Sequence, residues 1–468
     1  MLTLADTLEY LAGVRPIRAA QPIHAIVIDS RQAQAGDLFI ALKGERTDGH
    51  NFVRAAFARG AVAALIEQDA PPECDTVDLR PGAPAVTEVS LPACLRVTNV
   101  LKALQDLSGW WRAKFRVRVI GITGSVGKTS TKELVWAVLS RRFRTLRSEG
   151  NLNNEIGVPL TLLQLEPGYQ RVALEMGMYA RGEIARLCEL ARPSVGVVTN
   201  IGPVHLERLG SLEAIAAAKA ELIEALPQDG VAILNYDEPL VRDMAPKSKA
   251  RVMTYGLDDR ADLWADEIES EGIEGISFEM HYRGEGLHVH VPLLGRHSVH
   301  TALRAAAVGL AEGMMWDDII AGLQDHQAQI RLVAVPGPQG STILDDTYNA
   351  SPASMFAALN LLAELGGRKI AVLGDMLELG SYEEEGHRLV ARRAMDVADI
   401  LICVGSLGRI IGEEALSLGM DPERVCLSPN NQEAIECLQK SIQPGDYILI
   451  KGSRGMQMEE IVITLGKG

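Results

Sequence analysis

The chain has 468 residues, of which 47% are hydrophobic and 23% charged, a composition typical of a globular protein with apolar cores. Its length predicts about three domains. A formal net charge of −15 disfavours nucleic acid and anionic membranes as partners. The sequence shows neither a signal peptide nor an apolar run long enough to span a bilayer, so we expect a cytoplasmic enzyme without membrane insertion.

The first domain, which we place at residues 1–98, has the pattern of a small α/β fold. Short apolar runs bounded by turn residues predict strands at 23–30, 37–42 and 61–66 and a helix at 52–59. Residues 68–92 are rich in Pro, Asp and Glu and predict a loop. A helix at 101–114 leads into the next domain.

The second domain, placed at 99–314, alternates β-branched apolar runs with amphipathic helices. This alternation predicts a parallel sheet covered by helices on both faces. The strands fall at 117–122, 172–174, 195–199 and 231–235, and the helices at 128–140 and 211–226. Residues 262–291 then predict an antiparallel excursion, which a helix at 297–313 follows.

The third domain, placed at 315–468, repeats the alternation of strands and helices. We therefore predict an α/β fold of three domains: a small α/β domain, a central P-loop-type parallel-sheet domain and a C-terminal Rossmann-like domain. In the third domain the strands are expected at 341–344, 369–373, 400–404 and 447–450, and the helices at 355–365, 384–397, 407–418 and 432–441.

A glycine-rich loop follows the first strand of the second domain. Glycines let consecutive backbone N–H groups turn towards phosphate oxygens, and the N-terminus of the next helix adds a partial positive charge. A lysine there pairs with the outer phosphates and a threonine hydroxyl suits Mg²⁺. The P-loop pattern wants glycine where this chain has Ile122, yet the Gly-Lys-Thr core between strand and helix still predicts a nucleotide site. Its residues are Gly124, Ser125, Val126, Gly127, Lys128 and Thr129.

Two polar residues follow later strands of the same predicted sheet. Glu175 ends one strand, at the edge where ligands bind to parallel sheets, and a carboxylate there suits Mg²⁺. A salt bridge at the rim fits Glu175 equally well. His205 lies just past the next strand, and its position fits both a structural histidine and a metal ligand.

Lys219 lies in the apolar stripe of helix 211–226, four residues after Ile215 and three before Leu222. In one interpretation, its stem covers the core while its amine reaches water. In the other, the lysine is desolvated and its pKa is lowered. A neutral amine can react with CO₂ to form a carbamate, a carboxylate-like metal ligand. The spacing alone does not decide between these interpretations.

Together these motifs resemble the Mur ligases of bacterial cell-wall synthesis, nearly from end to end of the chain. The shared elements are the loop at 123–129, Glu175 and the segment 199–206. Longer blocks resemble the members that add D-alanyl-D-alanine. They are GERTDGH at 44–50, GNLNNEIGVP at 150–159, DDTYNASP at 345–352 and GDMLELG at 374–380.

The resemblance implies how the substrates and cofactors bind. The first domain would hold the uridine end of UDP-N-acetylmuramoyl-tripeptide, through Ser30, Arg31, Lys43, Asp48 and His50. ATP would bind the phosphate loop, with Asp346 and Asn349 near the nucleoside and Arg331 at the γ-phosphate. Mg²⁺ would be bound by Thr129 and Glu175, and a second ion by His205 and a carbamylated Lys219. Asn151 and Asn154 would face the substrate.

The implied reaction is ATP-driven formation of a peptide bond. The tripeptide carboxylate takes the γ-phosphoryl group, and the amine of D-alanyl-D-alanine then displaces phosphate from the acyl phosphate. Lys128, Lys219, His205 and Arg331 would be the catalytic residues. The expected partners are these small molecules, with no nucleic acid, and the expected state is a monomer whose domains close on binding.

One departure from the family pattern stands in the helix at 297–313. The family usually has a His-Asn pair there and a second asparagine three residues on, whereas this chain has Ser298 and Thr301. Two rival functions therefore stay open. One is a ligase of the same fold for another carboxylate, of folate-polyglutamate or cyanophycin type, and the other is a nucleotide-binding regulator without ligase activity.

Overall fold

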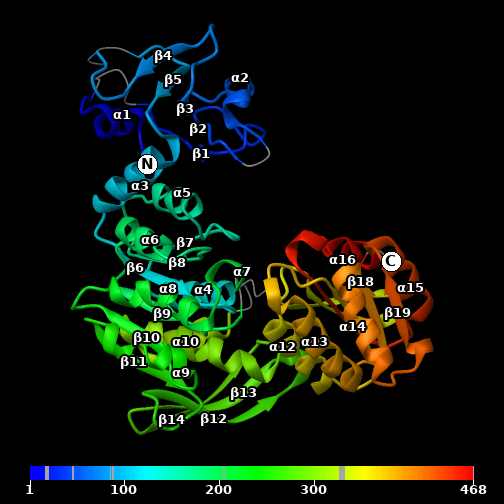
Figure 1. Ribbon diagram of the computed structural model, residues 1–468. Helices are drawn as coiled ribbons and strands as arrows, with labels where there is room; N and C mark the ends of the chain where they lie inside the picture. Colours follow the sequence, from blue (N-terminus) through cyan, green and yellow to red (C-terminus); the bar gives the residue numbers. More distant parts are fainter. Residues whose placement is uncertain are drawn as a thin grey trace. The chain divides into compact units, whose positions relative to one another are not determined.

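The computed structural model describes residues 1–15, 21–44, 47–84, 86, 89–203, 206–325 and 332–466 (Figure 1). The described residues form an α/β structure, as the sequence predicted. The chain divides into two compact units. The first comprises Met1–Gly121, Phe143–Gly177 and Glu183–Pro193, and the second comprises Ile122–Arg142, Met178–Gly182 and Ser194–Gly468.

The first unit opens on a five-stranded sheet whose strand pairs are all parallel, in the order β1-β2-β3-β5-β4. Strand β4 shows that the prediction of a loop throughout 68–92 was wrong. Its sequence, Asp-Thr-Val-Asp, is polar because it lies at the edge of the sheet with half of its residues exposed. The elements are α1 (Leu4–Ala12), β1 (Ile26–Val27), β2 (Leu38–Ile40), η2 (Gly49–Phe52), α2 (Val53–Ala58), β3 (Ala63–Ile66), β4 (Asp75–Asp78) and β5 (Ala93–Arg96).

The rest of the first unit contains three strands in the order β6-β8-β7 and three helices. Trp111, buried in α3, donates its indole N–H to the carbonyl of Leu165, at 3.0 Å, and so fixes this helix to the end of α5. The elements are α3 (Val100–Ala113), β6 (Arg118–Thr123), β7 (Thr145–Arg147), α5 (Gly157–Leu163), β8 (Arg171–Glu175) and α6 (Glu183–Ala191).

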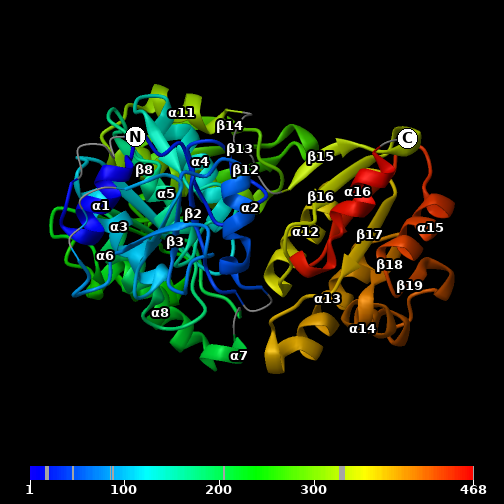
Figure 2. The same cartoon turned by 90° about the horizontal axis from the view of Figure 1, so that it is seen from above.

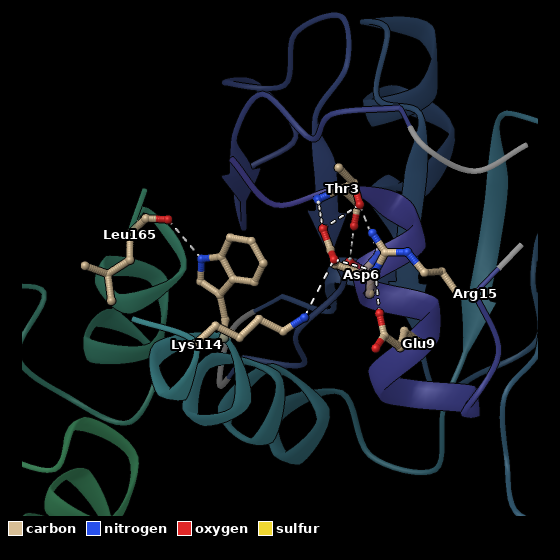
Figure 3. A network of polar contacts seen from close by, with 8 residues as sticks. Thr3, Asp6, Glu9, Arg15, Lys114 and Leu165 are labelled. Atoms are coloured by element: carbon tan, nitrogen blue, oxygen red, sulfur yellow. Dashed lines mark hydrogen bonds and ion pairs between the residues drawn. The ribbon is translucent and has the colours of Figure 1, made fainter. Parts of the chain in front are cut away.

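Helix α1, which the sequence did not predict, begins with a capping box. Asp6 donates its backbone N–H to the Thr3 hydroxyl, at 3.1 Å, and its carboxylate accepts the Thr3 N–H, at 2.9 Å. Arg15 donates to the carboxylates of Asp6 and Glu9 (Figure 3). Lys114 Nζ lies 3.8 Å from Asp6 Oδ1, so the same carboxylate links α1 to the end of α3.

The second unit begins with the end of β6, which lies beside β9. Its strands follow the order β14-β13-β12-β11-β10-β9-β6, parallel from β9 to β12 and antiparallel from β12 to β14. The predicted parallel sheet and antiparallel excursion are thus confirmed. The elements are α4 (Lys128–Ser140), β9 (Val195–Val198), α7 (Leu206–Leu209), α8 (Leu212–Glu224), β10 (Val231–Asn235), α9 (Pro239–Arg242), β11 (Arg251–Gly256), β12 (Leu263–Ser270), β13 (Ile276–Tyr282), β14 (Glu285–Val291), α10 (Val299–Ala311) and α11 (Trp316–Leu323).

The C-terminal part of this unit is a six-stranded sheet in the order β15-β16-β20-β17-β18-β19, in which β15 alone is antiparallel to its neighbour (Figure 2). Helices cover both faces, as predicted: Leu344 packs in the core with α12, α13 and α14, and its neighbour Ile343 packs with α15 and α16. The elements are β15 (Val333–Pro336), β16 (Thr342–Asp346), α12 (Pro352–Glu364), β17 (Lys369–Gly374), α13 (Glu383–Val397), β18 (Ile400–Val404), α14 (Gly405–Ser417), β19 (Val425–Ser428), α15 (Asn431–Ser441), β20 (Tyr447–Lys451) and α16 (Glu459–Leu465).

Within the described residues, no helix combines the length and the apolar character that a membrane span requires.

Candidate active site

The predicted phosphate loop lies between β6 and α4, where parallel strands of the second unit end. Gly124 and Gly127 have φ angles of 147° and 80°, which side chains rarely adopt. A Cβ on Gly124 would stand 1.8 Å from Thr199 Oγ1, so this position tolerates no side chain. The strand–loop–helix context that the sequence predicted is therefore present.

Residues that follow β9 hold this loop in place. The Thr199 hydroxyl donates to the Val126 carbonyl, at 2.7 Å, and the Val126 N–H donates to Asn200 Oδ1, at 2.9 Å. The Ser125 hydroxyl accepts the Gly202 N–H, at 2.8 Å. The loop geometry is thus fixed by the protein itself, which reduces the entropy lost when a ligand binds.

Lys128 is the first residue of α4, at the helix end that carries a partial positive charge. Its Nζ donates to the carbonyls of Gly124 and Ser125, at 2.9 and 3.2 Å. Thr129 follows it and is buried. Backbone N–H groups, an ammonium group and a hydroxyl group therefore gather in one short segment, and this set of groups suits a phosphate ligand.

Lys219 on α8 reaches the same loop. Its side chain is buried, with 2% exposed, and its Nζ donates to the Gly124 carbonyl at 2.9 Å. Burial, and secondly the charge of Lys128, lowers the pKa of Lys219 well below its usual range. The structure thus decides between the two interpretations of Lys219, because its amine is desolvated and does not reach water.

The two departures from the family pattern are Ser298, the N-cap of α10, and Thr301 in its first turn, and both hydroxyls are bound within the chain. The Ser298 hydroxyl donates to the Leu294 carbonyl, at 2.7 Å. The Thr301 hydroxyl accepts a hydrogen bond from Arg304 Nη2, at 2.8 Å. Arg304 is itself buried and was not among the predicted site residues.

In the first unit, Glu175 ends β8 and is buried. Its carboxylate accepts a hydrogen bond from the Asn153 amide, at 2.8 Å, and its backbone N–H donates to the Ser148 hydroxyl, at 3.2 Å. Asn151 is exposed, and Asn154 Oδ1 accepts the N–H groups of the first turn of α5. Of the three asparagines, it is therefore Asn153, not singled out from the sequence, that orients the carboxylate.

The predicted uridine-binding residues lie around the five-stranded sheet. Ser30 is buried, and Arg31 is 84% exposed and forms a bidentate pair with Asp29, whose carboxylate it contacts at 2.7 Å. The Arg31 guanidinium lowers the pKa of Asp29 to about 2. Lys43 is exposed.

Asp48 and His50, in the same block, are bound to each other. His50 Nδ1 lies 2.6 Å from Asp48 Oδ1, and His50 Nε2 accepts the Glu67 N–H at 3.0 Å. Because Nε2 accepts, Nδ1 carries the proton and donates to the carboxylate. Both ring nitrogens are therefore satisfied by the protein.

In the C-terminal sheet, Asp346 and Lys451 are register partners on β16 and β20. Lys451 is buried, and its Nζ contacts Asp346 Oδ2 at 2.6 Å and the Asn349 carbonyl at 2.9 Å. This lysine thus joins the end of β16, where Asp346 lies, to the loop that carries Asn349. The two other predicted site residues, His205 and Arg331, lie outside the described residues.

Comparison with known proteins identifies the family. Models named Mur ligase family, catalytic domain; Mur ligase middle domain; and Mur ligase, glutamate ligase domain match residues 22–108, 122–309 and 330–454. A UDP-N-acetylmuramoyl-tripeptide--D-alanyl-D-alanine ligase of Bacillus subtilis (strain 168) is 39% identical, over 95% of this chain and 93% of its own length. The chain belongs to the Mur ligase family. The Escherichia coli (strain K12) ligase of the same name is 36% identical over 95% of this chain and 94% of its own.

Solved structures of Mur ligases share the fold. A crystal structure of MurF from Acinetobacter baumannii has a TM-score of 0.84 at 31% identity and covers 100% of both chains. MurF of Thermotoga maritima, in complex with ADP, has a TM-score of 0.79 at 27% identity over 95% of this chain and 97% of its own. Mycobacterium tuberculosis folylpolyglutamate synthase, at 20% identity and a TM-score of 0.63, shares the fold alone.

Three of the residues that the sequence analysis missed carry signals visible in the sequence. Asn200 lies two residues past the buried strand β9, and Lys451 ends β20. Arg304 is a cation in an otherwise apolar stretch of α10. Asn153 differs, because nothing in the sequence separates it from the asparagines on either side.

Proposed function

We propose that this Mur ligase joins D-alanyl-D-alanine to the terminal carboxylate of UDP-N-acetylmuramoyl-tripeptide, using ATP. One observation carries the proposal: Lys128 and the buried Lys219 both donate to the Gly124 carbonyl, each at 2.9 Å, within a phosphate loop. The names of the relatives support the two substrates, and the ADP complex of a MurF supports the nucleotide. The enzyme acts in the cytoplasm as a monomer.

The chemistry requires anionic groups to approach one another. The tripeptide carboxylate attacks the γ-phosphorus, and ADP leaves. The amine of the dipeptide then attacks the acyl phosphate, loses a proton and expels phosphate. Lys128, the loop N–H groups and Arg331 offset the repulsion between the oxygens, and catalysis of this kind depends on positioning and charge stabilisation.

Magnesium fits the oxygen donors of this chain. The Thr129 hydroxyl and the Glu175 carboxylate are each hard ligands of the kind that Mg²⁺ prefers, and the Asn153 amide orients the carboxylate. When bound, Mg²⁺ neutralises phosphate charge. The lowered pKa of Lys219 favours the neutral amine, the form that reacts with CO₂, which supports a carbamate ligand at this position. His205 is proposed as its partner on the resemblance alone.

The proposed domain limits are 1–98, 99–314 and 315–468. The family models at 122–309 and 330–454 fall within the second and third ranges and support them, whereas the model at 22–108 extends past residue 98. We assign the uridine end of the substrate to the first domain, through Ser30, Arg31 and Lys43, while Asp48 and His50 stabilise the segment that carries Lys43. Asp346 and Asn349 bind the nucleoside of ATP. Asn151 and Asn154 face the tripeptide. The domains close over the acyl phosphate to exclude water, so small-angle scattering curves should differ between the ligand-free and fully liganded protein.

Phosphate release tests the function directly. Phosphate should appear only when ATP, UDP-N-acetylmuramoyl-tripeptide and D-alanyl-D-alanine are all present, and mass spectrometry should detect the ligated product. A Lys128→Ala variant should release phosphate about 10²–10³ times more slowly. Equal release without the dipeptide contradicts the ligase. Activity with a folate and glutamate would favour the rival substrate class, and no release with any acceptor would favour a regulator.

A further inference from the structure

Arg304 is a buried cation beside the phosphate loop, and no step of the proposed reaction uses it. It lies on α10 with 5% of its surface exposed, among alanine, leucine and valine residues. Its Nη2 lies 3.4 Å from the point that a Cβ on Gly127 would occupy. The guanidinium therefore reaches the turn of the loop directly before Lys128.

The protein satisfies this guanidinium only in part. Nη2 donates to the Thr301 hydroxyl at 2.8 Å, and Nη1 lies 3.5 Å from the Tyr255 hydroxyl, at the outer limit of a hydrogen bond. Its Nε, although buried, has no hydrogen-bond partner within the described part of the chain. A buried donor without a partner destabilises the folded protein, so the presence of this arginine points to a ligand that accepts its hydrogen bond.

The charge of Arg304 is also unbalanced. Over the described ranges, no carboxylate forms an ion pair with it. Asp237 is held elsewhere: its carboxylate contacts His300 Nε2 and the Leu257 N–H, each at 2.8 Å. Arg304 and Lys128 thus place two cationic side chains at one glycine-rich turn. A buried charge is stabilised only when it is paired and hydrogen-bonded, so Arg304 requires an anion.

We propose that Arg304 binds a phosphate of the nucleotide, as a second cation beside Lys128, and that Thr301 orients its guanidinium for this contact. The planar guanidinium suits phosphate because it can donate two parallel hydrogen bonds, which a lysine cannot. The assignment rests on the proposed ATP dependence and extends it, because it moves part of the phosphate recognition from the loop to α10. Thr301, which replaces the asparagine usual in the family, then acts together with Arg304 in binding phosphate.

A comparison of ADP binding with adenosine binding tests whether Arg304 contacts phosphate or only supports the fold, because adenosine carries no phosphate. The full chain is titrated with ADP, and adenosine is measured by competition. An Arg304→Met variant should bind ADP about 10- to 100-fold more weakly, the loss typical of a hydrogen bond to a charged group, and adenosine within about twofold of the original chain. Arg251→Met, a change to an exposed arginine at the opposite end of β11 from Tyr255, is the control and should change neither affinity.

Unchanged ADP affinity in Arg304→Met overturns the proposal, and so does an equal loss for ADP and adenosine, which is what a purely structural arginine would cause. If Arg304→Met does not fold, Arg304→Lys carries the test. This variant keeps the positive charge but cannot donate two parallel hydrogen bonds. It should weaken ADP binding about 3- to 10-fold and leave adenosine binding unchanged. Failure of the original chain to bind ADP at all would instead refute the proposed function.

Discussion

The phosphate loop and the Asp48–His50 block are equally prominent in the sequence, yet their polar groups are used in opposite ways. Around the loop, Lys128 and Lys219 share one carbonyl oxygen and no described carboxylate pairs with Arg304. In the block, Asp48 accepts from His50 and from the Gln68 amide, at 2.8 Å, and the histidine accepts from a backbone N–H.

This difference distinguishes polar groups that bind a ligand from polar groups that stabilise the fold. Polar groups that balance one another stabilise the fold, whereas an accumulation of one sign of charge requires a ligand of the other sign. A recognisable sequence block can therefore serve ligand binding or fold stability, and the hydrogen-bond partners of its side chains distinguish the two roles.

The largest effect is expected at Lys219. A Lys219→Ala variant should lose about 10²–10³-fold in turnover, because the group proposed to bind a metal ion is removed, and acetate or formate should restore part of the activity. Lys247→Ala, a change to a lysine that is 43% exposed, serves as the control. Full activity of Lys219→Ala in the phosphate-release assay would refute the carbamate.

Gly124→Ala tests whether the loop is as tightly held as its contacts imply. The added Cβ would stand 1.8 Å from Thr199 Oγ1, so we expect a loss of about 1–3 kcal/mol in the free energy of unfolding and weaker ADP binding. A Cβ on Gly366 meets nothing within 4 Å, so Gly366→Ala should change stability by less than about 0.5 kcal/mol. Equal unfolding midpoints of the two variants in urea would argue against a rigid loop.

His50→Phe should act on stability rather than on substrate binding. It removes a donor from Asp48 and an acceptor from the Glu67 N–H, at a cost of about 1–3 kcal/mol. Denaturant unfolding measures this loss, and the KM for UDP-N-acetylmuramoyl-tripeptide should change little. An increased KM with unchanged stability would mean that His50 contacts the substrate, as the resemblance implied.

The smallest effect is a pH dependence at Asp48. The His50 backbone N–H, followed by its ring, lowers the pKa of Asp48 from 3.8 to about 2. A carboxyl group with a lowered pKa stabilises the fold above its unfolded pKa, and the contribution is lost as pH falls towards the folded value. The stability difference between the original chain and Asp48→Asn should therefore be greatest above pH 4, at less than about 1 kcal/mol, and should shrink towards pH 2. A difference independent of pH would contradict this assignment.

Much of the fold followed from the sequence because its signals are local. Helix α4 and strand β10 begin and end where the amphipathic and β-branched patterns predicted. Strand β4 was missed because an edge strand needs no apolar alternation, and α1 was missed although its capping box is visible at Thr3.

The sequence by itself determined the phosphate loop, the α/β class and the anomaly at Lys219, since glycine spacing and apolar periodicity are properties of short segments. Only the tertiary structure decided that Lys219 is desolvated against Gly124, that His50 is occupied by its own chain, and that Arg304 stands beside the loop with no carboxylate paired to it among the described residues. These three facts depend on contacts between residues far apart in the chain, and charge balance and desolvation are set by such contacts alone.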